Sequence, residues 1–139
     1  MKKNLILAAG AVVFIGLVAW FVVPHKTAEV EVIVPSATSA TVTTGIDGQA
    51  TGLNVTVNPR QVVSDSRCPT GVQCIWAGTV TVRTALSTEV ANGEHVMTLG
   101  QPQVFGDYDV TLTAVTPDKS AGQEIPVSSY RLTYEIKKH

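Results

Sequence analysis

The chain begins with an apolar run and continues with short stretches in which apolar and polar residues alternate. Residues 5–23 are 19 consecutive uncharged and almost wholly apolar positions. At about 1.5 Å of rise per residue, such a run makes a helix close to the roughly 30 Å of a bilayer's hydrocarbon core. Lys2 and Lys3 precede the run, and Pro24 ends it. The pattern predicts a transmembrane helix over residues 1–24 with its N-terminus in the cytoplasm, because positive charges favour that side.

A cleaved signal peptide is the alternative interpretation of this segment. The apolar region of a signal peptide usually spans about 7–15 residues and ends at a cleavage site with small residues. Here the run is longer and continues into Val-Pro-His-Lys at residues 23–26. We therefore favour the anchor, and both interpretations export the rest of the chain.

Residues 25–52 are predicted to be a stalk and linker. Residues 29–34 alternate between Glu and apolar side chains, and residues 36–52 are rich in Ser, Thr, Ala and Gly. Such a composition is typical of a connecting segment.

From Leu53 onward the apolar positions recur with a period of two, which is typical of half-buried β-strands. The alternating stretches are residues 53–57, 79–86, 95–99, 108–114 and 130–136, with shorter apolar pieces at 62–63 and 104–105. Asn92-Gly93 adds a hairpin signal, and no helical period follows the anchor. About seven short strands predict an all-β domain over residues 53–139, either a small antiparallel sandwich or a barrel.

Composition and charge narrow the possible functions. The net charge is −1, and charged residues make up only 15% of the chain. A nucleic-acid-binding domain normally carries a basic patch, so no nucleic-acid partner is expected.

The two cysteines, Cys68 and Cys74, are six positions apart in an exported segment. In an oxidising compartment such a pair predicts a disulfide. A redox-active pair would normally be Cys-x-x-Cys at the start of a helix, and a metal site would need about four ligands. The histidines stand alone along the sequence, at His25, His95 and His139. No metal and no cofactor is therefore predicted.

The segment around the cysteines is the candidate interaction loop. Ser66 as a nucleophile is disfavoured because no Gly-x-Ser-x-Gly sequence surrounds it. Asp65 is expected to accept backbone N–H groups in a turn and Arg67 to pair with a carboxylate. Trp76 is expected to pack in the core against the disulfide, with a ligand-stacking role as the alternative. The candidate interaction residues are Asp65, Arg67, Thr70, Gln73 and Trp76.

Residues 65–78, with the pattern Asp-Ser-Arg-Cys-Pro-x-x-Val-x-Cys-x-Trp-Ala-Gly, resemble a signature of a family of small exported bacterial proteins. The resemblance extends to the C-terminus and covers roughly the last 80 residues. It implies an envelope location and a β domain. The family has no established activity, so the resemblance implies no reaction and no site residue.

Two weaker patterns involve acidic residues. Asp107 and Asp109 could share one face of a strand and coordinate Ca²⁺ if a third acid converged on them. A hydrolase would need two carboxylates about 5–9.5 Å apart, for which Asp65 with Asp109 or Glu124 are the candidates. Nothing in the sequence selects such a pair, and no catalytic residue is predicted.

These patterns favour a single-pass protein of the bacterial cytoplasmic membrane whose C-terminal domain is extracytoplasmic. The first hypothesis is a non-enzymatic module of the cell envelope that binds an envelope protein or a cell-wall component. The alternatives are a periplasmic hydrolase that uses carboxylates assembled by the fold, and an accessory subunit of a membrane complex.

Overall fold

The computed structural model describes residues 38–139. The predicted anchor over residues 1–24 and the stalk up to residue 37 lie outside the described residues and stay predictions. Within residues 38–139, no helix is long and apolar enough to span a bilayer. The helical element in this part of the chain is η1, a single 3₁₀ turn at Val127–Ser129.

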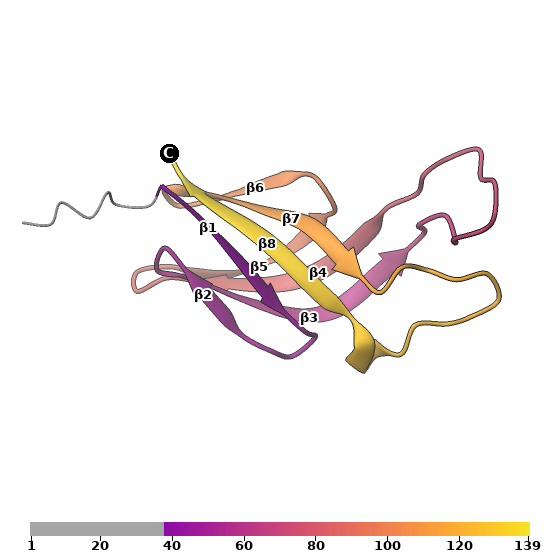
Figure 1. Ribbon diagram of the computed structural model, residues 1–139. Helices are drawn as coiled ribbons and strands as arrows, with labels where there is room; N and C mark the ends of the chain where they lie inside the picture. The colour runs from indigo at the N-terminus through magenta and orange to yellow at the C-terminus, as the bar shows by residue number, and fades with distance from the viewer. Residues whose placement is uncertain (1–37) are drawn as a thin grey trace, which may run out of the picture. The chain divides into compact units, whose positions relative to one another are not determined.

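Eight strands form two four-stranded antiparallel sheets, so the all-β prediction is confirmed (Figure 1). The first sheet contains, in spatial order, β1 (Ser39–Thr44), β8 (Arg131–Lys138), β7 (Tyr108–Thr116) and β6 (Pro102–Phe105). The second contains β2 (Ala50–Gly52), β3 (Val55–Asp65), β4 (Val80–Ser87) and β5 (Asn92–Thr98).

The strand order combines features of the two predicted architectures. Each strand lies beside the next along the chain, and β8 pairs with β1, as in an up-and-down barrel. The hydrogen-bonded ladder is interrupted where the chain passes from β1 to β2 and from β5 to β6. The domain is therefore a β-sandwich with the strand order of a barrel opened at two seams.

One hydrophobic core joins the inner faces of the two sheets. It is made of fourteen buried apolar side chains, with β3, β4 and β5 contributing from one sheet, β6, β7 and β8 from the other, and Tyr130 from the position just before β8. Alternation is clearest in β4, where Val80, Val82 and Leu86 face inward. The fourth inward residue, Thr84, shares a hydrogen bond of 2.9 Å with the Tyr134 hydroxyl of β8. This bond satisfies two buried polar groups at once and links the sheets through the core.

The folded domain starts earlier than the predicted boundary at Leu53. β1 and β2 lie within the segment 25–52 that the sequence assigns to a stalk and linker, so that assignment is wrong for these two strands. β1 pairs with β8 over six register positions. Its residues are mainly Ser and Thr because it is an edge strand with an exposed outer face, and that composition imitates a linker.

The strand directions divide the loops between two ends of the sandwich. The chain enters at Ser39 and leaves after Lys138 at one end, here called the terminal end. The other end, here called the long-loop end, carries the β3–β4 connection, residues 66–79, and the β7–β8 connection, residues 117–130. Figure 1 shows these two connections extending together beyond the sheets, away from the C-terminus.

Candidate functional site

The predicted disulfide between Cys68 and Cys74 is confirmed. The two Cα atoms are 5.9 Å apart, and no free cysteine remains in the described residues. The bond closes a ring of seven residues inside the β3–β4 connection. A closure of this size contributes about 2 kcal/mol to stability on a chain-entropy estimate.

Beneath this loop, Asp65 and Arg67 form a bidentate ion pair. Arg67 Nε donates to Asp65 Oδ1 at 3.0 Å, and Arg67 Nη2 donates to Asp65 Oδ2 at 2.7 Å. The backbone N–H of Arg67 also donates to Asp65 Oδ1, at 3.2 Å. The predictions that Asp65 accepts a backbone N–H and that Arg67 pairs with a carboxylate are confirmed.

The pair also fastens the end of β3 to the opposite sheet. Arg67 Nη1 donates to the carbonyl of Val115 in β7 at 2.7 Å, and the Tyr130 hydroxyl donates to Asp65 Oδ2 at 3.0 Å. Lys119 Nζ donates to the backbone carbonyl of Asp65 at 2.9 Å. We call these five residues, Asp65, Arg67, Val115, Lys119 and Tyr130, the Asp65 clamp.

The electrostatics of the clamp favour a charged Asp65. Burial raises the pKa of its carboxyl, but the hydrogen bonds from Arg67 and Tyr130 outweigh burial and leave the pKa below its usual value. The hydrogen bonds that Arg67 donates to the Asp65 carboxylate raise the pKa of Arg67. The side chains of Arg67 and Asp65 are only 13% and 9% exposed. The structure therefore places these two predicted interaction residues under the loop, where they support it.

The base of the loop is held by further backbone contacts. The Ser66 N–H donates to the carbonyl of Thr79 at 2.8 Å, and the Cys68 N–H donates to the carbonyl of Ala77 at 3.0 Å. Gly78 lies opposite, with a φ of 70°, and a Cβ there would overlap the carbonyl oxygen of Ser66. Only glycine tolerates both the backbone angle and this close approach.

A second contact joins the two long connections. The Thr70 N–H donates to the carbonyl of Lys119 at 2.8 Å, and Thr70 forms a parallel bridge with Ser120. Three features therefore hold the β3–β4 connection in place: the disulfide, the Asp65 clamp and the contact with the β7–β8 connection.

Residues 70–78 are all exposed and form what we call the loop tip. Trp76 is 80% exposed, Ile75 is 90% exposed and Val72 is 48% exposed. The prediction that Trp76 packs in the core is therefore wrong. The predicted interaction residues Thr70 and Gln73 lie on the same exposed tip. Trp76 lies in the connection between the end of β3 at Asp65 and the start of β4 at Val80, so it belongs to neither of the strands whose inner faces fill the core.

Ile75 and Val72 belong to the candidate site but were not predicted for it. A signal was present in the sequence, because residues 68–79 contain no acidic or basic side chain and no histidine. A twelve-residue loop without charge is unusual on a protein surface, where loops are normally polar.

The other predicted acidic groupings are not assembled. Asp65 lies at the long-loop end and Asp109 at the terminal end, so they form no carboxylate pair. Asp65 and Glu124 line one shallow depression, but the carboxylate of Asp65 is occupied by the clamp. No group of three potential metal ligands occurs among residues 38–139, and the Asp109 carboxylate lies 3.7 Å from His139 Nδ1.

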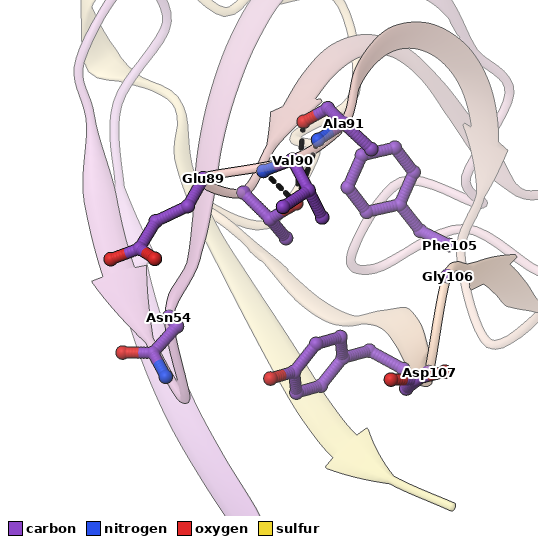
Figure 2. A pocket seen from close by; sticks show the side chains of 9 residues that line it. Asn54, Glu89, Val90, Ala91, Phe105, Gly106 and Asp107 are labelled. Atoms are coloured by element: carbon purple, nitrogen blue, oxygen red, sulfur yellow. Dashed lines mark hydrogen bonds between the residues drawn. The ribbon is translucent and has the colours of Figure 1, made fainter.

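A cavity of about 300 Å³ opens at the terminal end (Figure 2). Phe105, Val90 and Ala91 form one part of its lining, while Glu89 and Asp107 lie on opposite sides of it (Figure 2). The two carboxylates do not converge on one point of the cavity. It offers an apolar hollow without a catalytic grouping.

Comparison with protein-family models, curated proteins and solved structures finds no significant match for this chain. The resemblance of residues 65–78 to a family of exported bacterial proteins therefore stays a prediction.

Proposed function

We propose that this chain is a non-enzymatic binding module of the bacterial cell envelope, held at the membrane by its N-terminal segment, that contacts its partner through the loop tip. The observation that carries the proposal is the exposure of Trp76 and Ile75 on a loop that is otherwise fixed. Exposed apolar patches on soluble domains mark sites of interaction. Tryptophan is also among the residues that most often dominate binding energy.

The support of the loop fits a binding role. Binding normally costs conformational entropy when a mobile loop becomes ordered. The disulfide and the Asp65 clamp impose that order before any partner arrives. The residues that hold the loop, Asp65 and Arg67, are charged and largely buried. The residues proposed to bind, Ile75 and Trp76, are apolar and exposed. Support and binding therefore use different residues.

The acidic residues support a binding module over a hydrolase. Asp65 is engaged by four hydrogen bonds through its carboxylate and has a lowered pKa, so it is a poor proton donor at neutral pH. Glu89 and Asp107 lie on opposite sides of the terminal-end cavity. The loop tip itself carries no group that could act as an acid, a base or a charged nucleophile.

Photocrosslinking in bacterial cells tests this proposal. A photoreactive residue is placed at Gln73 on the tip, and in a separate variant at Val90, which is 94% exposed but lies at the terminal end. We expect an adduct, with protein or with lipid, from position 73 and none of the same kind from position 90. Adducts that are equal at both positions, or absent at both, would overturn the proposed function.

A further inference from the structure

We propose that the loop tip inserts into the surface of a phospholipid bilayer. This inference rests on the proposed function and names the partner of the same site. The first support is geometric: the neighbouring residues Ile75 and Trp76 are both almost fully exposed, and every other residue of the tip is at least partly exposed. A protrusion with exposed apolar side chains suits a fluid that can surround it. A flat protein surface would cover one side only.

The chemistry of the tip matches the bilayer interface. Tryptophan is enriched at that interface because its ring is apolar while its N–H can still meet water or headgroups. Ile75 and Val72 supply side chains that prefer hydrocarbon. Charged groups would oppose insertion, and residues 68–79 contain none.

The irregular backbone of the tip sets the depth of insertion. Backbone polar groups without partners are costly in the hydrocarbon core, so irregular loops do not occur there in contact with lipid. The tip has no regular secondary structure. Its backbone therefore stays at the level of the headgroups, and only the side chains of Val72, Ile75 and Trp76 reach deeper.

The exposed apolar area favours lipid over a stable protein interface. Large aromatic side chains bury about 150–250 Å² each. Trp76 with Ile75 and a half-exposed Val72 therefore offer on the order of 400 Å², about half of what one partner supplies to a standard protein interface, roughly 800 Å². Such an area suits a shallow second contact for a chain that is already held at the membrane.

The charges around the tip define the kind of membrane binding. At the long-loop end the acidic side chains are Asp47, Asp118 and Glu124, apart from the ion-paired Asp65. The cations at this end are Lys119 and Arg131, apart from the ion-paired Arg67, so the acidic side chains outnumber them. Among residues 38–139, the long-loop end therefore has no excess of positive charge that would attract anionic headgroups. Insertion is therefore driven by apolar contact and does not depend on anionic lipid or on low salt.

The test uses the full chain with the substitution Trp20→Phe, which leaves Trp76 as the only tryptophan. The protein is reconstituted into phosphatidylcholine vesicles with or without bromine atoms on the acyl chains, which quench tryptophan at short range. We expect Trp76 to emit at a shorter wavelength than exposed tryptophan and to lose most of its emission in brominated vesicles. Added sodium chloride or phosphatidylglycerol should leave this loss unchanged.

Matched variants separate insertion from mere proximity. The double variant Val72→Asn/Ile75→Asn should abolish most of the quenching, whereas Val90→Asn, an exposed apolar position at the terminal end, should leave it unchanged. Full Trp76 emission in brominated vesicles would overturn the inference. If position 73 nevertheless crosslinks to a protein in cells, the proposed function stands and only the lipid partner is wrong. If neither quenching nor crosslinking occurs, both proposals fail.

Discussion

Asp65 forms hydrogen bonds with three of the residues that hold the long-loop end together, Arg67, Lys119 and Tyr130. Its carboxylate accepts hydrogen bonds from Arg67 and Tyr130, and its backbone carbonyl accepts one from Lys119. The side chain is almost fully buried, at 9% exposure. Removing one partner of a buried ion pair leaves the other charge without compensation, which makes such a pair costly to break.

The substitution Asp65→Asn should therefore lower the free energy of unfolding by about 3 kcal/mol, because Arg67 would keep a buried charge without its carboxylate partner. Urea denaturation of the two proteins measures the difference. The matched control is Glu135→Gln, which removes an exposed ion pair with Lys137 and should change stability by less than about 0.5 kcal/mol. An equal effect of the two substitutions would contradict the clamp.

The pH dependence of that difference follows from the lowered pKa of Asp65. Because the pKa in the folded state lies below the ordinary value of 3.8, the charged carboxylate contributes stability above that pH. The contribution is lost as the pH falls below it towards the folded-state pKa. Denaturation at a series of pH values should show the stability advantage of the natural protein over Asp65→Asn constant near neutrality and shrinking below about pH 4. An advantage that grew on acidification would exclude this role.

The pKa of Tyr134 is shifted in the opposite direction to that of Asp65, so its effect on stability is expected at alkaline pH. Burial raises the pKa of its hydroxyl to about 12, although the hydrogen bond with Thr84 lowers it in part. A raised pKa means that the stability from the neutral hydroxyl is complete below pH 10 and is lost as the pH rises towards 12. The natural protein should therefore lose more stability over this interval than Tyr134→Phe. Equal losses would show that Tyr134 ionises without penalty in the folded state.

At the scale of elements, the close approach of the two ends of the β3–β4 connection requires glycine at position 78. Gly78 and Gly71 both have positive φ angles, 70° and 79°. They differ in their surroundings, because a Cβ at Gly78 would overlap the Ser66 carbonyl while one at Gly71 would meet nothing within 4 Å.

This difference provides a matched pair of substitutions. Gly71→Ala should cost about 1 kcal/mol, the strain of a left-handed residue. Gly78→Ala should cost clearly more, because the backbone at the loop base must also separate. Thermal unfolding measures both, and amide hydrogen exchange at Cys68 should rise only in Gly78→Ala. Equal costs for the two variants would mean that the loop base is not tightly closed.

Element by element, the sequence predicted the strands where their periodicity is strong. β4, β7 and β8 match the alternating stretches, because their inner faces are packed with apolar side chains. β3 is longer than predicted and passes through Pro59. Proline is tolerated there because β2 pairs only with Val55–Val57, so no ladder bond needs an N–H at position 59, and the Pro59 carbonyl accepts from the Asp47 N–H at 2.7 Å. The predicted hairpin exists, but its turn lies at residues 88–91 and Asn92 already begins β5.

The candidate site was predictable only in part. The disulfide, the backbone contact of Asp65 and the pairing of Arg67 with a carboxylate follow from local sequence, but the structure was needed to identify Asp65 as that carboxylate. The exposure of Trp76 does not, because a tryptophan beside a cysteine fits a core equally well until the packing of both sheets is known. The contacts of Lys119 and Tyr130 with Asp65 span more than fifty residues of sequence, and no local pattern signals them.

At the scale of the whole domain, β1 and β2 belong to the fold. Without residues 39–52, β8 would lose β1, one of its two partner strands, over six register positions, and the core would lose the packing of Val42, Ile46 and Ala50. A fragment of residues 38–139 should therefore unfold cooperatively, while residues 53–139 should lack a cooperative transition. Circular dichroism during heating distinguishes them. A cooperative transition in the shorter fragment would show that the domain folds without β1 and β2, as the prediction of a linker over residues 25–52 implies.

The most direct test of the account replaces the two most exposed side chains of the tip and measures stability and binding together. The double variant Ile75→Ser/Trp76→Ser should keep the free energy of unfolding within about 0.5 kcal/mol, as is usual for surface substitutions. It should also abolish the adduct formed in cells by a photoreactive residue at position 73. An unchanged adduct would contradict the role of Trp76 and Ile75 in binding. A loss of several kcal/mol would instead show that the two side chains belong to the folded core.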